Sequence, residues 1–205
     1  MDYFKGIQST TPASPDQVMV FDIDETVLSN AEEWLGPGNE ESEASSSSSS
    51  SSSSGSRSRM LTGAQVKERA QSKNNRPALE ATHKLFQYLY DSGYSIAFIT
   101  GRSEPSRNGT VANLERAGYG KQCPPANAGS APWSTRTKEP CYVVLHLREP
   151  NDSRLASIYK PERRKTLQDA GFRLAGNMGD QFSDLEGLYP AVASWKLPNP
   201  MYAIL

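Results

Sequence analysis

The chain has 205 residues, with 22 Lys and Arg against 23 Asp and Glu, so its formal net charge is −1. This length fits one ordinary domain, and a net charge near zero argues against a general binder of polyanions such as nucleic acid. Two cysteines exclude a disulfide-dense scaffold and a four-cysteine zinc site, and no apolar run is long enough to span a membrane.

Two polar segments interrupt the apolar pattern. Residues 36–59 include ten consecutive serines and offer no apolar face to bury, which predicts a disordered segment. A phosphorylated regulatory tract is the alternative interpretation of these serines. Residues 120–140 contain four prolines and several glycines and small polar residues, which predicts an inserted loop rather than a regular element.

The remaining chain alternates between short apolar runs and helical patterns. In chain order they predict a strand at 18–23, a helix at 77–91, a strand at 94–100, a helix at 110–117, a strand at 141–147, a helix at 161–170, and short strands at 172–179 and 191–195. Such alternation predicts an α/β fold with a parallel sheet and helices on both faces. In sheets of this kind the chemistry lies at the carboxyl ends of the strands.

Residues that could take part in binding or catalysis lie where these predicted strands end, or just before the following helix. They are Asp22, Asp24, Thr100, Gly101, Arg102, Lys160, Asp180 and Asp184. Asp22 and Asp24 are two residues apart, so on a strand they share a face and can point into one crevice. Taken singly, each residue has an ordinary explanation as a turn, a helix cap or a solvated surface group. Their occurrence at the ends of consecutive strands favours a common site.

These residue types suit phosphoryl transfer. Carboxylate oxygens are the ligands that Mg²⁺ prefers, and a carboxylate can also attack phosphorus to form an aspartyl-phosphate. A second carboxyl group nearby can protonate the leaving alkoxide and later deprotonate water. A hydroxyl, a backbone N–H beside glycine and a lysine can neutralise the phosphoryl oxygens.

Longer sequence motifs around these residues resemble those of a known protein family. The segments VFDIDETVLSN, TGRSE, YKPERRKTL, GNMGDQFSDL and KLPNPMY resemble the plant acid phosphatase and vegetative storage protein family of the haloacid dehalogenase (HAD) superfamily, which is related to class B and class C acid phosphatases. The resemblance implies a single HAD-like, Rossmannoid domain over residues 1–205, with a small cap at 30–76 inserted after the first strand. It leaves the segments at 36–59 and 120–140 as insertions.

The resemblance also implies roles for individual residues. Asp22 matches the nucleophile, and Asp24 matches the general acid and base, whose main-chain carbonyl also contacts Mg²⁺. Asp180 matches a Mg²⁺ ligand, and Asp184 an acid that supports or completes the metal site. The metal-binding set is therefore Asp22, Asp24, Asp180 and Asp184.

Three further residues match substrate-binding positions of the family. Thr100 and Gly101 match the phosphate-binding turn. Lys160 matches the lysine that balances the charge of the nucleophile and the phosphate.

The implied function is Mg²⁺-dependent hydrolysis of small phosphate monoesters, with no nucleic acid or membrane as partner. The alternatives are a catalytically weak storage or binding protein of the same fold, a phosphotransferase using the same intermediate, and an incomplete gene product. The oligomeric state stays open, a homodimer included. The first residues lack the apolar core of a signal peptide, whereas family members are often secreted or vacuolar, so a truncated precursor also stays open.

The remaining reactive residues have less definite roles. Cys123 and Cys141 flank the proline-rich insertion, and either a disulfide or two free thiols fits the sequence. His83 and His146 are expected to have packing or surface roles, because no nucleophile motif accompanies them.

Overall fold

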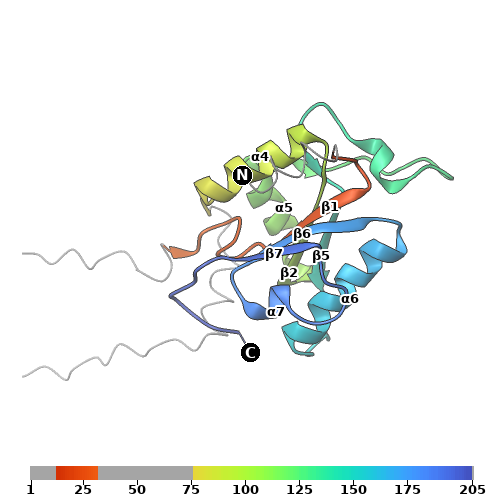
Figure 1. The fold of residues 1–205 in the computed structure, drawn as a ribbon. Helices are drawn as coiled ribbons and strands as arrows, with labels where there is room; N and C mark the ends of the chain where they lie inside the picture. The colour runs from red at the N-terminus through yellow and green to blue at the C-terminus, as the bar shows by residue number, and fades with distance from the viewer. Residues whose placement is uncertain (1–12, 32–75, 205) are drawn as a thin grey trace, which may run out of the picture.

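The computed structural model describes residues 13–31 and 76–204. Within these ranges, five parallel strands form one sheet in the order β5-β2-β1-β6-β7 (Figure 1). The strands are β1 (Gln17–Phe21), β2 (Ser95–Ser103), β5 (Val144–Arg148), β6 (Arg173–Gly179) and β7 (Ala193–Lys196). The expected α/β fold with a parallel sheet is therefore confirmed.

Helices cover both faces of this sheet. α4 (Glu80–Ser92) and α5 (Arg107–Arg116) lie on one face, and α6 (Ala156–Asp169) and the short α7 (Phe182–Leu185) lie on the other (Figure 1). Short 3₁₀ helices follow β2 (η1, Glu104–Ser106) and lie within the proline-rich loop (η2, Pro132–Thr135). None of the helices in the described ranges is long and apolar enough to cross a membrane.

β1 is the central strand, and its side chains enter two separate cores. Met19 and Phe21 join the cluster that α4 and α5 cover, whereas Val18 and Val20 join the cluster that α6 covers. Successive side chains on a strand point to opposite faces, so a strand covered on both faces needs apolar residues at every position. This explains why the first strand has a continuous apolar run rather than an alternating pattern.

Several boundaries differ from those expected. The predicted helix at 161–170 begins at Ala156, so Lys160 and Pro161 lie inside α6 rather than before it. Proline at the first helical position is common, which made 161 the apparent start. The helix nevertheless continues through Pro161, because buried side chains on either side of it, including Tyr159 and Leu167, pack against the sheet.

Two other differences concern the strands. The predicted strand at 141–147 is divided into β4 (Cys141–Tyr142) and β5. β2 is longer than expected and ends at Ser103, so the Thr100-Gly101-Arg102 sequence lies within it. The physical cause of the longer strand is the pairing of Ser103 with Arg148 of β5 beyond an irregularity in the register.

The residues on either side of the predicted cap at 30–76 lie side by side. Ser29 donates its N–H to the carbonyl of Pro77 at 2.9 Å, and Leu79 donates its N–H to the carbonyl of Val27 at 2.9 Å. Leu28 and Ala78 form an antiparallel bridge between them. We call this paired segment, residues 27–29 and 77–79, the stem. Most of the predicted cap, including the serine-rich segment at 36–59, lies outside the described residues.

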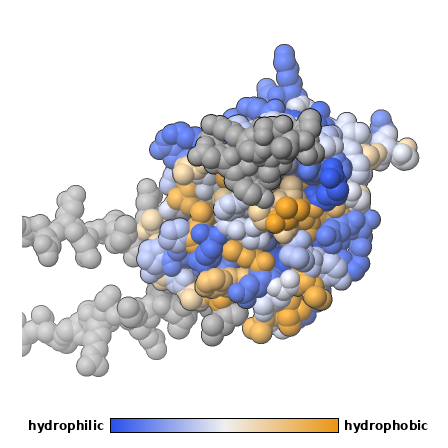
Figure 2. All heavy atoms as spheres, in the orientation of Figure 1, coloured by the Kyte–Doolittle hydropathy of each residue, from blue (hydrophilic) through white to orange (hydrophobic). Residues whose placement is uncertain are grey.

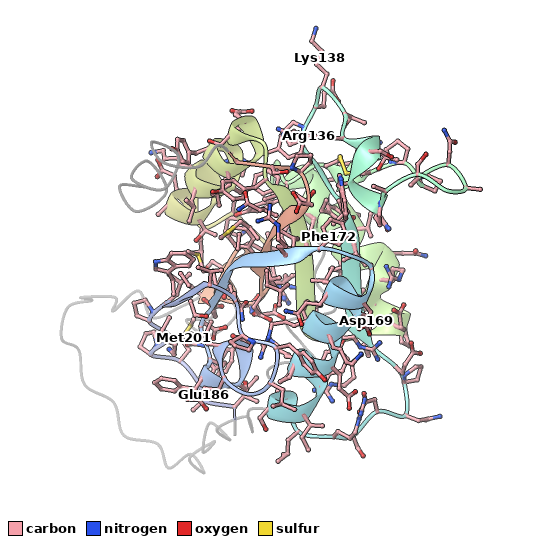
Figure 3. The ribbon with its side chains drawn as sticks, turned by 45° about the vertical axis from the view of Figure 1, so that its right-hand side comes forward. Arg136, Lys138, Asp169, Phe172, Glu186 and Met201 are labelled. Carbon is pink, nitrogen blue, oxygen red and sulfur yellow. A yellow bond between two sulfur atoms is a disulfide. The ribbon has the colours of Figure 1, made fainter. Side chains whose placement is uncertain are left out.

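The loop at 120–140 contains β3 (Lys121–Gln122) and η2 and is otherwise irregular. A disulfide joins Cys123 to Cys141, which decides between the two alternatives for these residues (Figure 3). β3 pairs with β4 beside the disulfide. The Tyr90 hydroxyl hydrogen-bonds with the carbonyl oxygens of Thr137 (2.8 Å) and Glu139 (3.0 Å), so α4 also holds this loop.

Apolar side chains are exposed on the face that carries α6 and α7. Figure 2 shows apolar surface there, and the exposed residues include Leu155, Ile158, Phe182 and Leu188. Leu155 and Phe182 flank the ends of α6 and α7 that face the candidate site described below.

The disulfide yields the first prediction. Changing both Cys123 and Cys141 to alanine should lower the free energy of unfolding by about 3 kcal/mol, because the bridge restricts a short loop in the unfolded chain. Urea unfolding of the variant and the unaltered protein measures this difference. Two titratable thiols in the unfolded but unreduced protein would show that the bridge is absent.

Candidate active site

The carboxyl ends of β1, β2 and β6 meet at one edge of the sheet, and a small pocket lies there. Its lining residues are Asp22, Asp24, Gly101, Ala156, Lys160, Asp180, Gln181, Ser183, Tyr202 and Ile204. Five of the seven predicted site residues belong to this set. The free volume is about 20 Å³, enough for about one water molecule.

The turn after β1 sets the positions of Asp22 and Asp24. The N–H of Asp22 bonds to the carbonyl of Met178 in β6 at 2.9 Å, which continues the sheet pairing past the strand end. The N–H groups of Val27 and Leu28 then bond to the carbonyl of Ile23 at 3.0 and 2.9 Å. The chain therefore reverses at once, and both carboxylates stay at the sheet edge.

Lys160 reaches the pocket from α6 and bridges two carboxylates. Its Nζ donates to Asp22 Oδ1 at 2.5 Å and also to Asp184 Oδ1. Burial raises the pKa of Asp22, and the neighbouring carboxylates raise it further against the opposing charge of Lys160. Burial alone would lower the pKa of Lys160, but Asp184 and Asp22 outweigh it and hold that pKa above its usual range. The lysine is therefore a buried cation that favours the ionised form of Asp22.

Asp24 is held by a different set of cations. Arg102 donates from Nη2 to Asp24 Oδ1 at 2.7 Å and from Nε to Oδ2 at 3.1 Å, and Arg76 donates from Nη1 to Oδ1 at 3.2 Å. Asn30 adds an amide bond to Oδ1 at 3.1 Å. Burial raises the pKa of Asp24, but Arg102, Arg76 and Asn30 outweigh it and hold the pKa well below its usual range. In this arrangement Asp24 is a carboxylate.

Arg102, Arg76 and Asn30 were not assigned roles from the sequence. Arg102 is part of the TGRSE motif, so its position at the strand end was a usable signal. Arg76 and Asn30 lie at the two ends of the predicted cap at 30–76, and the pairing of residues 27–29 with 77–79 brings the two ends close together. The backbone of Arg76 is fixed by the Asn113 side chain of α5, which bonds to its N–H at 3.2 Å and its carbonyl at 2.9 Å.

Asp180 follows β6 and is oriented by amide side chains. Gln181 Nε2 and Asn199 Nδ2 donate to Asp180 Oδ2 at 2.5 and 2.7 Å, and the Thr26 hydroxyl donates to Oδ1 at 3.4 Å. Burial raises the pKa of Asp180 and the Asp184 carboxylate adds to this, while the two amides oppose it. Oδ1 is therefore the oxygen with the weaker protein contact.

Asp184 packs closely against the end of β6. A Cβ on Gly179 would overlap its side chain, so only glycine leaves room for Asp184 at this position. Asp184 Oδ2 accepts the N–H of Gln181 at 2.9 Å as part of a capping box on α7, and Oδ1 accepts Lys160. Both oxygens of Asp184 thus have protein donors.

Of the two predicted phosphate-binding residues Thr100 and Gly101, Gly101 is the one that lines the pocket. The Thr100 side chain is buried, and its hydroxyl accepts the N–H of Arg102 at 3.1 Å. His83 and His146 lie elsewhere: His83 hydrogen-bonds to the Gly118 carbonyl, and His146 to the Thr166 hydroxyl. Neither histidine lines this pocket.

The carboxylates can form a cation site. One oxygen from each of Asp22, Asp180 and Asp184 lies within 4.8 Å of the others, and all three residues are buried. Hard oxygen donors with several negative charges suit Mg²⁺ or a similar divalent cation. The donor set therefore fits the divalent cation that the sequence motifs imply.

Comparison with known proteins identifies the family. The family model of the HAD superfamily, subfamily IIIB (acid phosphatase), matches residues 2–205. The chain belongs to this subfamily. It is 41% identical over 130 residues to acid phosphatase 1 of Solanum lycopersicum, covering 63% of this chain and 43% of that protein.

Other subfamily relatives include storage proteins. Vegetative storage protein 2 of Arabidopsis thaliana is 28% identical over 190 residues, covering 91% of this chain and 56% of that protein. The chain therefore spans about half the length of these relatives. The class C acid phosphatase from Bacillus anthracis has the same fold, with a TM-score of 0.55 and 20% identity over 98% of this chain and 73% of that one.

The buried lysine yields the second prediction. Lys160→Met leaves Asp22 and Asp184 without their shared cation, and should lower the free energy of unfolding of metal-free protein by about 3–5 kcal/mol at pH 8. Lys165→Met is the matched control, because Lys165 lies on the exposed side of α6 in an ion pair with Asp169. The control should change the free energy by less than about 0.5 kcal/mol.

This loss should be smaller at pH 5 than at pH 8. Burial already raises the pKa of Asp22, and removing Lys160 raises it further. A carboxyl group with a raised pKa binds more protons in the folded state, so its destabilising effect grows as the pH rises from the unfolded to the folded value. Equal losses at both pH values in urea titrations would contradict the explanation by buried charge.

Proposed function

We propose that this chain hydrolyses phosphate monoesters as an acid phosphatase, through a phosphorylated Asp22 and with Mg²⁺ as cofactor. The observation that carries the proposal is the juxtaposition of Asp22, bonded to Lys160, with Asp24 and Asp180 in one pocket. Membership of the acid phosphatase subfamily supports the same chemistry. A Mg²⁺-dependent activity screen over a panel of phosphate monoesters, across a range of pH, tests it.

In the first half of the reaction, an oxygen of Asp22 attacks phosphorus and the bond from phosphorus to the ester oxygen breaks. The leaving alkoxide takes a proton from Asp24, and Asp22 carries the phosphoryl group. Lys160 balances the charge that collects on Asp22 and the phosphoryl oxygens. Gly101 lines the pocket, and in the proposed mechanism its backbone N–H would donate to one of these oxygens.

In the second half, Asp24 accepts a proton from water as the water oxygen attacks phosphorus. The bond between phosphorus and Asp22 breaks, and inorganic phosphate leaves. Bound Mg²⁺ would neutralise phosphoryl charge and hold a phosphoryl oxygen beside Asp22. Asp180 is the ligand we favour for it together with Asp22, whereas both oxygens of Asp184 already have protein donors, which favours a supporting role.

Before substrate binds, the ionisation state of Asp24 suits only the second half of the reaction, in which it acts as a base. Held by Arg102 and Arg76, it is ionised and is ready to act as a base. To act as an acid it has to gain a proton. Asp24 lines the pocket, so the negative charge of a phosphate dianion bound there would raise the pKa of Asp24 and favour its protonation.

Two residues near the C-terminal end of the described chain, Tyr202 and Ile204, form part of the pocket wall. We propose that the cap at 30–76 and these two residues together select the leaving group. The stem supports this role for the cap, because Asn30 and Arg76 at its ends both contact Asp24.

Two other functions use the same fold. A storage protein is suggested by the Arabidopsis relative, but the presence of Asp22, Asp24, Lys160 and Asp180 favours an enzyme. A phosphotransferase would pass the phosphoryl group from Asp22 to an alcohol instead of water. Product analysis in the presence of an added alcohol distinguishes transfer from hydrolysis, and a chromogenic phosphate ester distinguishes an enzyme from a storage protein.

The nucleophile yields the third prediction. Asp22→Asn should abolish turnover, because the amide oxygen is a much weaker nucleophile, while the fold is retained. Steady-state assays with a nitrophenyl phosphate measure the loss, and thermal unfolding checks the fold. Asp169→Asn, in an exposed ion pair of α6, is the control and should keep full activity. More than a few per cent of residual activity in Asp22→Asn would contradict a covalent mechanism.

Asp24 yields the fourth prediction. Asp24→Asn should lower the hydrolysis of an alkyl phosphate by about 10²–10⁴-fold, because both proton transfers are lost. A nitrophenyl ester departs without protonation, so its first step should suffer less and phosphorylated Asp22 should accumulate. Stopped-flow measurements should then show a burst of nitrophenol before slow turnover. Equal losses for both esters without a burst would assign Asp24 a structural role instead.

A further inference from the structure

The segment after β7 lies against the end of β6, where Asp180 stands. Lys196 pairs with Gly179 in the sheet, and the N–H of Leu197 bonds to the carbonyl of Gly179 at 2.8 Å. The following residues, 198–204, which we call the 198–204 segment, therefore begin beside Asp180. Met201 of this segment lies toward the same end of the molecule as Glu186, away from Arg136 and Lys138 of the proline-rich loop (Figure 3).

Both polar atoms of the Asn199 side-chain amide, Nδ2 and Oδ1, form hydrogen bonds. Its Nδ2 donates to Asp180 Oδ2 at 2.7 Å. Its Oδ1 accepts the N–H groups of Met201 at 2.9 Å and Tyr202 at 3.4 Å, which closes an Asx turn. The turn fixes the plane of the amide, and the amide in turn fixes the Asp180 carboxylate.

A second amide acts on the same carboxylate oxygen. Gln181 Nε2 donates to Asp180 Oδ2 at 2.5 Å, and Gln181 Oε1 accepts the N–H of Ile204 at 2.9 Å. Both strong donors therefore bind Oδ2, whereas Oδ1 accepts the longer hydrogen bond from the Thr26 hydroxyl, at 3.4 Å. The two amides therefore fix the orientation of the Asp180 carboxylate and leave Oδ1 as the oxygen with the weaker protein contact.

We propose that Asn199 is a positioning residue for the cation ligand Asp180, so that the 198–204 segment is a working part of the metal site. This inference rests on the proposed Mg²⁺-dependent function. Groups that orient a metal ligand without touching the metal commonly change metal affinity by about 10–100-fold when removed. Because Gln181 still holds Oδ2, we expect a change of about 10-fold for Asn199 alone.

Two variants distinguish the effect of the Asn199 amide donor on Asp180 from the effect of the Asx turn. Asn199→Ala removes the amide donor and the Asx turn together. Asn199→Ser keeps a side-chain oxygen that can accept the same backbone N–H groups, but it is too short to reach Asp180. Asn151→Ala, in the exposed turn between β5 and α6, is the control. Isothermal titration calorimetry with MgCl₂ on the full chain measures the dissociation constant in each case.

We expect Mg²⁺ to bind about 10-fold more weakly to both Asn199 variants and with unchanged affinity to the control. Thermal unfolding should agree, with Mg²⁺ raising the melting temperature less for the two variants than for the unaltered protein. In assays, the Mg²⁺ concentration for half-maximal rate should rise, while kcat at saturating Mg²⁺ and KM for the ester should recover.

Unchanged Mg²⁺ affinity in both variants would overturn the inference, as would wild-type affinity in Asn199→Ser with a loss only in Asn199→Ala. The latter result would show that the turn matters and the donor does not. If the unaltered protein binds Mg²⁺ and hydrolyses esters in these cases, the proposed function stands and only the role of Asn199 fails. Absence of both Mg²⁺ binding and hydrolysis in the unaltered protein would overturn the two together.

Discussion

The gathering of buried carboxylates at one edge of the sheet is compatible with folding only because cations are buried with them. Lys160 lies between Asp22 and Asp184, and Arg102 neutralises Asp24. The positions of these cations constrain the rest of the domain. α6 has to approach the sheet closely enough for a lysine in its second turn to reach the end of β1, and the core beneath α6 holds it there.

Lys160 and Arg102 do not bond to every carboxylate of the site, and Asp180 is bonded to uncharged groups. Amide side chains donate to Asp180, the bonds described above for it within residues 13–31 and 76–204 include no cationic side chain, and burial raises its pKa. A divalent cation would supply what the protein does not, because it would stabilise the ionised forms of Asp22 and Asp180 at once. The proposed phosphate-binding residues and the proposed cation site are therefore parts of one electrostatic arrangement, and neither is expected to work alone.

The sequence predicted the features that depend on local patterns. Apolar runs predict the parallel strands, and the rule that chemistry lies at their carboxyl ends predicts that Asp22, Asp180 and Gly101 lie together. Lys160 was assigned to the site but misplaced relative to its helix, because Pro161 resembles a helix start. A proline is a strong local signal, and here tertiary packing overrides it.

The features that were missed depend on contacts between distant segments. Arg76 lies 52 residues from Asp24 along the chain, and nothing in its neighbours indicates a buried ion pair. Asn199 belongs to a motif that supported the family resemblance, but its contact with Asp180 follows from the pairing of β7 with β6. The state of Cys123 and Cys141 depends on redox conditions, which spacing alone does not report.

The order of the strands also has a consequence for biosynthesis. β1 is central, yet one of its two neighbours, β6, is synthesised about 150 residues later, and Asn199 follows Asp22 by 177 positions. At about 5–20 residues per second, a ribosome needs roughly 9–35 s for that interval. Until β6 is synthesised, one edge of β1 has no partner strand, and until α6 is synthesised, Asp22 lacks Lys160. Closure of the sheet around β1 and completion of the candidate site therefore both depend on the C-terminal part of the described chain.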